Sequence, residues 1–385
     1  MDKQHIGQNV RRLRMEKGWT QSILHEETRL SIPAIGNIER GKAEPRIANI
    51  KKIADALDVN MYELLREAPS LESVRFRANN KMKRRDNILV DVADWLNNYN
   101  LLESFAGEKT QSCIPKIISK LGKQPSSKEE IILAANLTRE FVGLENDEKI
   151  YDVCNLVESK GIKVYERKLN SSEFFGLSVG EKDGGPAIVV NTNDRISVER
   201  WIFTVAHELG HLILHQSAYD SAVESENDNE ELEANIFASH FLVPKEAFQK
   251  VWEDYYGMPF VNRVLRVKRI FNVSYKTILY RINEELDGKR NIWVMFYAGY
   301  KRQFGRSISK HAEPSGIQRK NFRSYEPESK ISEEPENLDK GEFGDGQYLS
   351  LIRKAIESEN ISVSKAAKML KLSITEFNQM AACWI

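Results

Sequence analysis

Cysteine is scarce in this chain. Its three cysteines, Cys113, Cys154 and Cys383, are scattered over 385 residues, and no two of them form a Cys-x-x-Cys pair. An odd number of widely spaced thiols excludes the disulfide frameworks that hold small secreted domains together. We therefore expect three inert thiols in a reducing, cytoplasmic environment.

Long apolar runs and a surplus of one charge are missing as well. No run approaches the roughly 18 consecutive apolar residues of a transmembrane helix, and the first residues lack the apolar segment of a signal peptide, so we expect neither. The 56 Lys and Arg residues balance 56 Asp and Glu residues, so any nucleic-acid site must be local. With 41% hydrophobic and 29% charged residues, the composition is that of a globular protein with more than one domain.

The N-terminal part of the chain, residues 5–66, has the pattern of five short helices. Apolar residues recur at helical spacing, Gly18 ends the first helix, and Thr20 and Ser31 can cap the second and third. The five predicted segments run from Ile6 to Gly18, from Thr20 to Thr28, from Ser31 to Gly41, from Ile47 to Leu57 and from Asn60 to Leu65.

The middle of the chain changes from helical to strand-like patterns. A basic connector precedes an amphipathic helix over Asp86 to Ser104, residues 107–127 predict a loop or short turn, and residues 128–160 predict further helix. A Gly-rich turn signal at residues 181–185 joins two apolar runs into a predicted hairpin. The predicted strands are Ile162 to Leu169, Phe174 to Val179 and Pro186 to Val190.

The C-terminal half returns to helices. Trp201 to His215 predicts a buried helix, more helices extend to about residue 286, and Trp293 to Tyr300 predicts another strand. Residues 305–345 are polar and predict a flexible linker before two short helices over about residues 347–385. The stretches 264–282 and 361–380 fit either simple packed helix pairs, which we favour, or helix-turn-helix units.

The buried helix contains the pattern His-Glu-x-x-His. His207 and His211 are about one helical turn apart, so both imidazoles project from one face and can hold one Zn²⁺. Glu208 is not spaced as a ligand, but it can take a proton from water next to the metal. The flanks are apolar, and burying these side chains without a metal would be costly, which favours a metal site over a chance match with core histidines.

A third protein ligand is expected in an acidic helix farther along the chain. Among Glu230, Glu231 and Glu233 we choose Glu233, because small side chains follow it, and we expect the other two to face solvent. The alternative for Glu233 is a solvated surface charge. His215 is rotated about 80° from His207 around the helix, so we expect a partly buried histidine, with a residue behind the ligands or an oxyanion helper as the alternatives. The ligand types favour Zn²⁺, with Mn²⁺ as the alternative.

Three segments of this region resemble the ImmA/IrrE family of metallopeptidases. They are His207-Glu-Leu-Gly-His211, Glu233-Ala-Asn-Ile-Phe-Ala238 and Phe241-Leu-Val-Pro244, and the resemblance covers about residues 130–285. It implies a small sheet on the His-Glu-x-x-His helix, a metal held by His207, His211 and Glu233, and Glu208 as general base. It also implies cleavage of a repressor or antitoxin protein. A strand beside the helix could hold substrate by β-augmentation, with Ala187–Asn191 as our candidate.

The N-terminal helices resemble the Xre/Cro-type helix-turn-helix over about residues 6–65. The resemblance is carried by Gly18-Trp-Thr-Gln21 and by Ser31-Ile-Pro-Ala-Ile-Gly-Asn-Ile-Glu-Arg-Gly-Lys42. It implies phosphate contacts from Gln21 and Lys42, with the Ser31–Arg40 helix in the major groove of DNA. Domains of this type often bind as dimers, so a homodimer is compatible with the resemblance, although no heptad repeat requires it.

The base-edge chemistry of this domain is weak. The positions that would reach base edges carry Ile32, Pro33, Gly36 and Asn37, and only Asn37 can make a bidentate contact with adenine. Twelve Lys and Arg residues against nine Asp and Glu residues in positions 1–66 give a charge of only +3. The alternative to DNA binding is a helical module for protein–protein contact or dimerisation.

These patterns together predict an α+β protein in five parts. An all-α helix-turn-helix domain is followed by a mainly helical, zincin-like metallopeptidase domain with a small β-sheet, and then by a C-terminal helical segment. The predicted boundaries are 1–68 for the helix-turn-helix domain, 69–127 for a helical connector, 128–300 for the metallopeptidase domain, 301–345 for the linker and 346–385 for the last segment.

Two functions fit this domain order. The first is a DNA-bound zinc peptidase that cleaves a transcriptional repressor or antitoxin, itself often a helix-turn-helix protein, to relieve repression. The second is a helix-turn-helix regulator whose metal domain senses or binds a ligand without proteolysis. The intact Glu208 favours the first function, because a purely structural metal site has no need of a base there.

Overall fold

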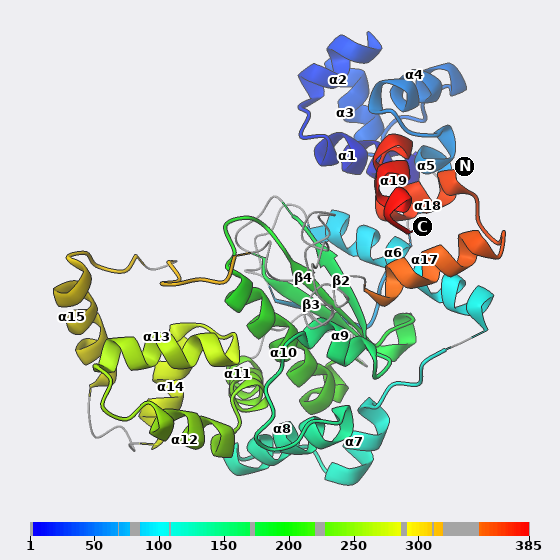
Figure 1. The fold of residues 1–385 in the computed structure, drawn as a ribbon. Helices are drawn as coiled ribbons and strands as arrows, with labels where there is room; N and C mark the ends of the chain where they lie inside the picture. The colour runs from blue at the N-terminus through cyan, green and yellow to red at the C-terminus, as the bar shows by residue number, and fades with distance from the viewer. Residues whose placement is uncertain are drawn as a thin grey trace. The chain divides into compact units, whose positions relative to one another are not determined.

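The computed structural model describes residues 3–67, 69–77, 85–107, 109–169, 174–219, 228–285, 291–309, 312–318 and 346–384. Helices dominate, and one four-stranded sheet lies in the middle of the chain (Figure 1). The chain divides into two compact units, Met1–Leu71 with Met82–Asp94, and Glu72–Lys81 with Trp95–Ile385. No helix of the described residues is long and apolar enough to cross a membrane.

The first unit contains the five predicted N-terminal helices. They are α1 (Lys3–Glu16), α2 (Gln21–Thr28), α3 (Ile32–Glu39), α4 (Ile47–Leu57) and α5 (Met61–Leu65). The predicted caps are confirmed, because the Thr20 hydroxyl accepts from the Ile23 amide and the Ser31 hydroxyl accepts from the Ala34 amide, both across 3.3 Å. Ten buried apolar side chains, which come from all five helices, form one small core.

The second unit holds the sheet and most of the helices. Its strands are β1 (Val74–Arg77), β2 (Lys163–Arg167), β3 (Gly176–Val179) and β4 (Ala187–Asn191). Its helices up to the sheet are α6 (Arg85–Ala106), whose first residues belong to the first unit, α7 (Ile114–Leu121), α8 (Lys128–Val142) and α9 (Val153–Glu158). The later helices are α10 (Val198–Leu214), α11 (Asp228–Leu242), α12 (Lys245–Asp254), α13 (Phe260–Phe271), α14 (Tyr275–Glu285), α15 (Ile292–Phe304), α17 (Gln347–Glu357), α18 (Val363–Leu370) and α19 (Ile374–Ala381).

The sheet has the strand order β1-β3-β4-β2. β3 is antiparallel to both β1 and β4, whereas β2 and β4 are parallel. The predicted hairpin is therefore confirmed as β3–β4, joined through a single 3₁₀ turn at Glu181–Asp183. Because β4 is paired on both sides, the prediction that Ala187–Asn191 offers a free edge to a substrate strand is wrong.

Helix α10 is the centre of the second unit's core. It lies against β3 and β4 on one side and against α11 on the other, and α8 packs in turn on α11 (Figure 1). Fifteen of its 17 residues are buried, although three of these are His207, Glu208 and His211. The polar motif therefore lies next to a large cluster of buried apolar side chains.

Three elements differ from the sequence predictions. β1 and α7 lie in segments expected to be a connector and a loop, and Trp293 to Tyr300, expected to be a strand, is part of helix α15. The reason in α15 is a helical repeat: Ile292, Phe296 and Tyr300 follow one another every four residues and are its buried side chains.

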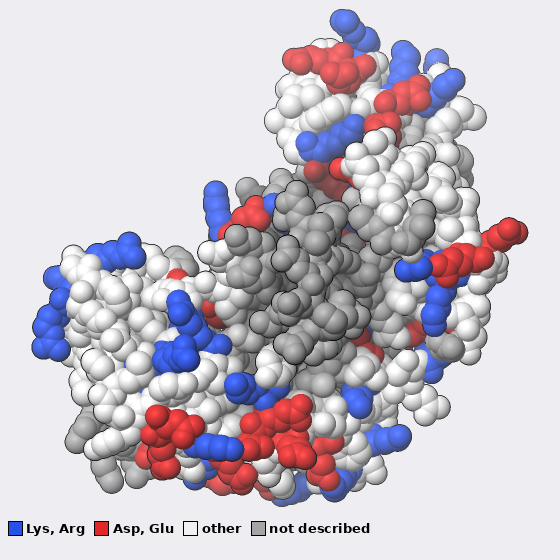
Figure 2. All heavy atoms as spheres, in the orientation of Figure 1, with Lys and Arg blue, Asp and Glu red and all other residues white. Residues whose placement is uncertain are grey.

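The segment predicted as a linker over residues 301–345 begins inside this fold. α15 continues to Phe304, and residues 312–318 pack beside α13 through Lys268, whose ammonium donates to the carbonyl oxygens of Pro314 and Ser315. Residues 319–345 lie outside the described part of the chain. The face of the molecule in Figure 2 shows basic and acidic side chains interspersed among its described residues, in keeping with the balanced formal charge.

Candidate metal centre

Helix α10 brings two imidazoles together in the core. It starts at Ser197, whose hydroxyl accepts from the Arg200 amide across 3.2 Å. Because His207 and His211 are one turn apart, their Nε2 atoms lie only 2.9 Å from each other, and the two side chains are 0% and 1% exposed. The predicted histidine pair is therefore assembled on one helix face.

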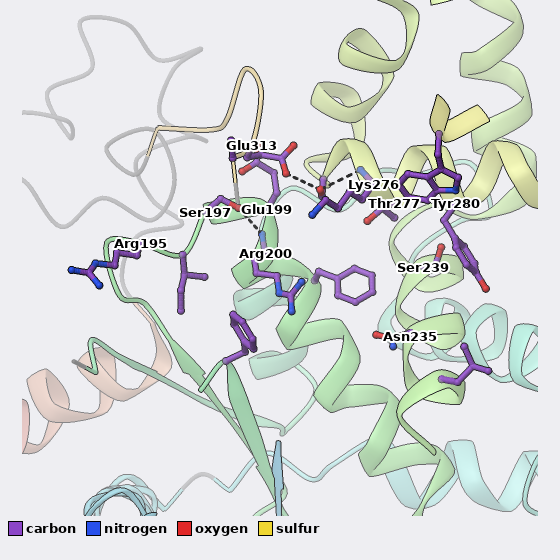
Figure 3. Close-up of a pocket in the computed structure, with 17 residues that line it drawn as sticks. Arg195, Ser197, Glu199, Arg200, Asn235, Ser239, Lys276, Thr277, Tyr280 and Glu313 are labelled. Carbon is purple, nitrogen blue, oxygen red and sulfur yellow. Dashed lines mark hydrogen bonds between the residues drawn. The ribbon is translucent and has the colours of Figure 1, made fainter. Parts of the chain in front are cut away.

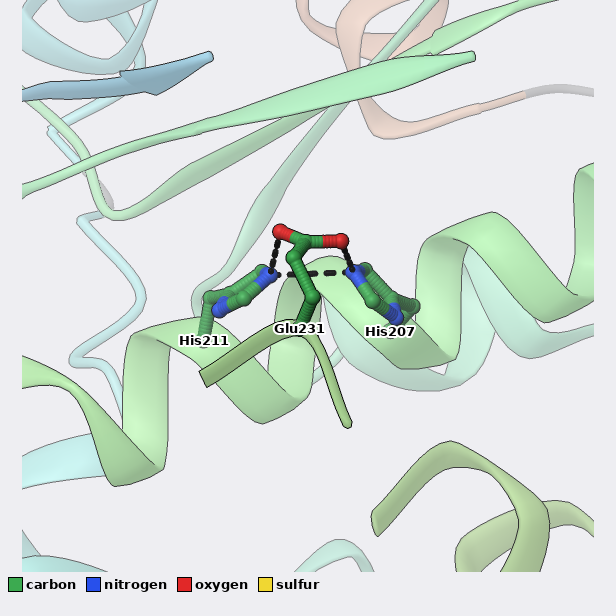
Figure 4. Close-up of side chains that lie close together, drawn as sticks. All are labelled: His207, His211 and Glu231. Carbon is green, nitrogen blue, oxygen red and sulfur yellow. Dashed lines mark hydrogen bonds and ion pairs between the residues drawn. The ribbon is translucent and has the colours of Figure 1, made fainter. Parts of the chain in front are cut away.

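Helix α11 supplies a carboxylate to this pair. The Glu231 oxygens lie 3.3 Å from His207 Nε2 and 3.2 Å from His211 Nε2 (Figure 4). One ligand atom from each of the three residues lies within 4.8 Å of those of the other two. The structure thus assembles a His-His-Glu group from two neighbouring helices.

Glu231, and not Glu233, is the carboxylate that the structure groups with the two histidines. Residues two apart on a helix point in nearly opposite directions, so only one of these two glutamates can face the pair. Glu233 reaches His215 instead, with its carboxylate 2.8 Å from His215 Nε2. The expectation for Glu233 is corrected accordingly, as is the expectation that Glu231 faces solvent.

Hydrogen bonds behind the imidazoles determine which ring nitrogen faces the group. The Glu233 carboxylate can only accept, so His215 Nε2 donates to it, and the neutral His215 ring accepts at Nδ1 from His211 Nδ1, 2.9 Å away. His211 Nε2 then carries a lone pair. His207 Nδ1 lies 3.1 Å from the Asn235 amide oxygen, and donation to that oxygen leaves a lone pair on His207 Nε2.

The electrostatics agree with this assignment. Burial lowers the pKa of His211 well below its ordinary value and also lowers the pKa of His215, so both rings are neutral at neutral pH. A carboxylate and two imidazole lone pairs that converge in a buried space repel one another unless a cation lies between them. The donor set therefore fits a divalent metal.

Glu208 lies beside the group with its own partners. Its Oε2 accepts from the Ser178 hydroxyl on β3 across 2.7 Å, and that hydroxyl accepts from the Tyr219 hydroxyl across 2.8 Å. β3 comes this close because Gly176 has no side chain: a Cβ there would lie 2.5 Å from Thr204 Cγ2. The sheet thus holds the Glu208 carboxylate in place from above α10.

A cavity of about 750 Å³ lies between α10, α11 and α14. Its walls come from the first half of α10, from α11, from α14 and from the segment around Glu313 (Figure 3). Asn235 lines the cavity and its amide oxygen lies 3.1 Å from His207 Nδ1, whereas His207, Glu208, His211 and Glu231 themselves are not part of the lining. Aromatic rings and cationic groups line much of it, and the Arg200 guanidinium lies 4.2 Å from the centre of the Phe175 ring.

The residues predicted to bind DNA lie in the first unit. Ser31, Ile32 and Pro33 are exposed at the start of α3, and Lys42 is exposed after its end. Asn37 is half-buried, and its amide oxygen accepts from the Arg40 guanidinium across 2.9 Å. These positions are compatible with the predicted contacts, which remain predictions.

Two residues that the sequence placed at the DNA interface, Gln21 and Gly36, have contacts within the domain. Gln21 donates to the Glu39 carboxylate across 2.7 Å, and Glu39 also pairs with the buried Arg14, so Gln21 is held at the start of α2. Gly36 is buried, and a Cβ at this position would lie 3.2 Å from the Arg40 guanidinium. Gly36 therefore makes room for Arg40 and does not itself form part of the exposed surface.

Sequence comparisons agree with the two units. Residues 10–64 match the helix-turn-helix family, and residues 157–283 match the IrrE N-terminal-like domain of peptidase family M78. An uncharacterised HTH-type transcriptional regulator of Sinorhizobium fredii is 35% identical over 60 residues, which are 16% of this chain and 78% of that protein. A hypothetical transcription factor of Neisseria meningitidis serogroup B is 31% identical over 80 residues, which are 21% of this chain and 74% of that protein.

Among solved structures, ComR from Streptococcus suis aligns with 96% of this chain and 94% of its own. The sequence identity is 15% and the TM-score is 0.17, a level that does not establish a shared fold. The two family matches carry the assignment, and they confirm the resemblances seen in the motifs. The chain therefore belongs to the Xre-type helix-turn-helix proteins in which an IrrE N-terminal-like, M78 peptidase domain follows the DNA-binding domain.

Proposed function

We propose that this protein is a DNA-binding zinc metallopeptidase that cleaves a transcriptional repressor or antitoxin protein and thereby relieves repression. The observation that carries the proposal is the buried group of His207, His211 and Glu231, with the Glu208 carboxylate beside it. Two imidazoles and one carboxylate from the protein are the ligand set of catalytic zinc sites that keep one position open. Zinc is preferred over manganese because two of the three ligands are imidazoles.

The side chains around the group have separate tasks in peptide hydrolysis. A zinc ion bound there supplies Lewis acidity toward water and toward the peptide carbonyl. Glu208 takes the proton from the attacking water and delivers it to the leaving amine. The Ser178 hydroxyl, itself held by Tyr219, donates to one Glu208 oxygen and orients the other.

The residues behind the ligands keep the imidazoles in the right tautomer. Asn235 accepts from His207, and the Glu233–His215 pair accepts from His211, so both Nε2 atoms present lone pairs. Partners of this kind fix ring orientation and raise the basicity of the ligand. Glu233 therefore orients His211 through His215, although it is not one of the three grouped ligands.

A protein substrate fits the surroundings of the group. The adjoining cavity of about 750 Å³ can take a side chain near the scissile bond, and Arg200 and Tyr280 lie on its walls. The helix-turn-helix domain would bring the peptidase to DNA, where a repressor is found. The predicted DNA contacts of Gln21, Ser31, Ile32, Pro33, Asn37, Arg40 and Lys42 belong to this proposal.

The Glu208→Gln variant tests the proposed chemistry. Amide in place of carboxylate keeps the shape and leaves the three ligands intact, so the variant should bind zinc like the wild type and lose cleavage. Zinc-loaded wild type and variant are added to an extract of the host cell, and newly formed N-termini are identified by mass spectrometry. Glu246→Gln, an exposed glutamate on α12, is the matched control and should behave as wild type.

The outcomes separate the two functions considered for this chain. Cleavage of a helix-turn-helix protein by wild type and control but not by Glu208→Gln supports the proposal. Zinc binding without any cleavage, combined with DNA binding that changes on addition of a ligand, would favour a non-proteolytic regulator, in line with the names of the two relatives. Cleavage that survives in Glu208→Gln would contradict the assigned base.

A further inference from the structure

The strand β1 covers one edge of β3, next to the metal centre. β1 runs antiparallel to β3, with Arg75 opposite Ser178, whose hydroxyl donates to Glu208. Residues directly opposite in a sheet point to the same face, so the Arg75 side chain points to the α10 side. In Figure 4, β1 is the blue strand beside the green strands above His207, His211 and Glu231.

The Arg75 side chain ends at the metal centre. Its guanidinium pairs with Glu230, the residue directly before Glu231 on α11. The Arg75 side chain is 12% exposed and that of Glu230 is 24% exposed, so the pair is partly shielded from water. β1 therefore reaches the group through a charged side chain as well as through its backbone.

The start of β1 is fastened by a separate set of contacts. The Asp183 carboxylate accepts from the amides of Glu72 and Ser73, across 2.7 and 2.6 Å. The buried Ser73 hydroxyl donates to the carbonyl oxygen of Tyr219 across 2.8 Å, and the Ser73 carbonyl accepts from the Gly180 amide across 2.8 Å. These bonds fix the register that places Arg75 opposite Ser178.

A protein substrate needs the edge that β1 occupies. An extended peptide gains affinity by adding a strand to an exposed sheet edge. β3 is the strand that holds Glu208 through Ser178, and its other edge is taken by β4. A peptide that pairs with β3 beside Glu208 must therefore take the place of β1. β1 also lies outside both family-matched ranges.

We propose that β1 is a pseudosubstrate strand. It occupies the groove for the substrate backbone, and Arg75 occupies a subsite formed by Glu230. The substrate is then an extended segment that runs antiparallel to β3 and carries Arg or Lys at the position of Arg75, and it binds only when β1 leaves. This inference rests on the proposed peptidase function, and it names the substrate class and the regulation of that site.

A cysteine pair can lock the strand in place. The bond between the Gly180 amide and the Ser73 carbonyl marks positions 73 and 180 as a hydrogen-bonded pair, so Val74 and Val179 form the next, non-hydrogen-bonded pair. Their Cα atoms are expected about 4.5 Å apart, within the range that a disulfide spans. The full-length, zinc-loaded variant Val74→Cys/Val179→Cys is studied oxidised and reduced. The native Cys113 and Cys154 are buried, and neither forms a disulfide.

Two zinc-binding probes report on the groove by titration calorimetry. The first is an acetylated tripeptide hydroxamate that contains arginine, and the second is acetohydroxamate, which needs no sheet edge. The oxidised variant should bind the tripeptide at least about tenfold more weakly than the reduced variant, because the open state is removed. Asp183→Ala should bind it about tenfold more tightly than wild type, because two charge-assisted bonds that fasten β1 are lost. Acetohydroxamate should bind all four proteins alike.

The Glu230 subsite has its own comparison. Wild type should prefer the arginine tripeptide over the same peptide with norleucine, and Glu230→Gln should lose this preference while it keeps its zinc. Equal binding of the tripeptide by the oxidised and reduced variants, with acetohydroxamate bound normally, would overturn the pseudosubstrate role alone. Failure of both probes to bind zinc-loaded wild type would overturn the metal centre and the proposed function with it.

Discussion

Alanine in place of Glu231 removes the carboxylate that lies 3.3 Å from His207 Nε2 and 3.2 Å from His211 Nε2. At the proposed zinc site, only two protein ligands then remain. Alanine in place of Glu233 leaves all three ligands and removes only the acceptor for His215 Nε2. Loss of a residue behind the ligands costs about 10- to 100-fold in metal affinity, so Glu233→Ala should fall in this range and Glu231→Ala should exceed it.

Competition with a chromophoric chelator gives the apparent zinc affinity of each purified variant at one fixed pH. A second readout is the rise of the melting temperature with added zinc, because a ligand that binds only the folded state stabilises it according to its affinity. We expect a large rise for wild type, a smaller rise for Glu233→Ala and almost none for Glu231→Ala. Glu246→Ala on α12 controls for the loss of one negative charge.

The relative zinc affinities of Glu231→Ala and Glu233→Ala decide which glutamate is the third ligand. If Glu233→Ala lost as much zinc affinity as Glu231→Ala, or more, then Glu231 would not be the third ligand. Helix α11 would then have to be rotated relative to the arrangement described above, because in that arrangement Asn235 and Glu231 lie on the same face of α11 and both contact the histidine pair.

Two further predictions concern the helices that carry the centre. Lys268→Met should destabilise the protein by about 3–5 kcal/mol, because the fully buried Glu199 carboxylate loses the ammonium 2.8 Å away. Denaturant titration measures this loss, and the double variant Glu199→Gln/Lys268→Met should recover most of it; a single-variant loss within experimental error would refute the argument. Gly210→Ala should cost about 1–3 kcal/mol and weaken zinc binding, because its Cβ would lie 2.9 Å from the Phe237 ring and push α11 away from α10. Phe237→Leu should restore much of both, and an unchanged melting temperature in Gly210→Ala would contradict this packing.

The sequence predicted best what depends on local spacing. The helices of the helix-turn-helix domain were predicted to within a few residues of their observed ends. The signals were the caps Thr20 and Ser31 and the apolar repeat of the first helix. The four-residue spacing of His207 and His211 determines that they share a helix face, whatever packs above it. These features could be predicted because the residues that cause them are neighbours in the chain.

The third carboxylate could not be chosen by such reasoning. Three glutamates lie within four positions at the start of α11, and which of them meets the histidines depends on the angle at which α11 crosses α10. One signal was available: Glu231 and Asn235 are one turn apart, so a ligand and an amide that steadies the first histidine fall on one face. The small side chains after Glu233 indicate how closely α11 can pack, but they do not indicate how α11 is rotated about its axis relative to α10.

The missed strand and the misassigned helix have different causes. Residues 74–77 alternate an apolar with a cationic side chain, Val-Arg-Phe-Arg, which is the period of a strand, but the cluster of charges around them favoured a connector. The segment over α15 is rich in aromatic and β-branched residues, which favour strands, yet its buried positions recur every four residues. Tertiary packing decided both elements.

The position of β1 in the chain makes its pairing with β3 one of the links between the two units. Residues up to Leu71 and again Met82–Asp94 belong to the first unit, whereas Glu72–Lys81 between them belong to the second unit. When residues 72–77 detach from β3, the second unit loses one of its links to the first unit and keeps the continuous helix α6, in which the division falls between Asp94 and Trp95. Binding free energies are reciprocal, so DNA that binds the first unit more tightly when β1 is detached would lower the cost of opening the groove, and a substrate that opens the groove would tighten DNA binding by the same factor.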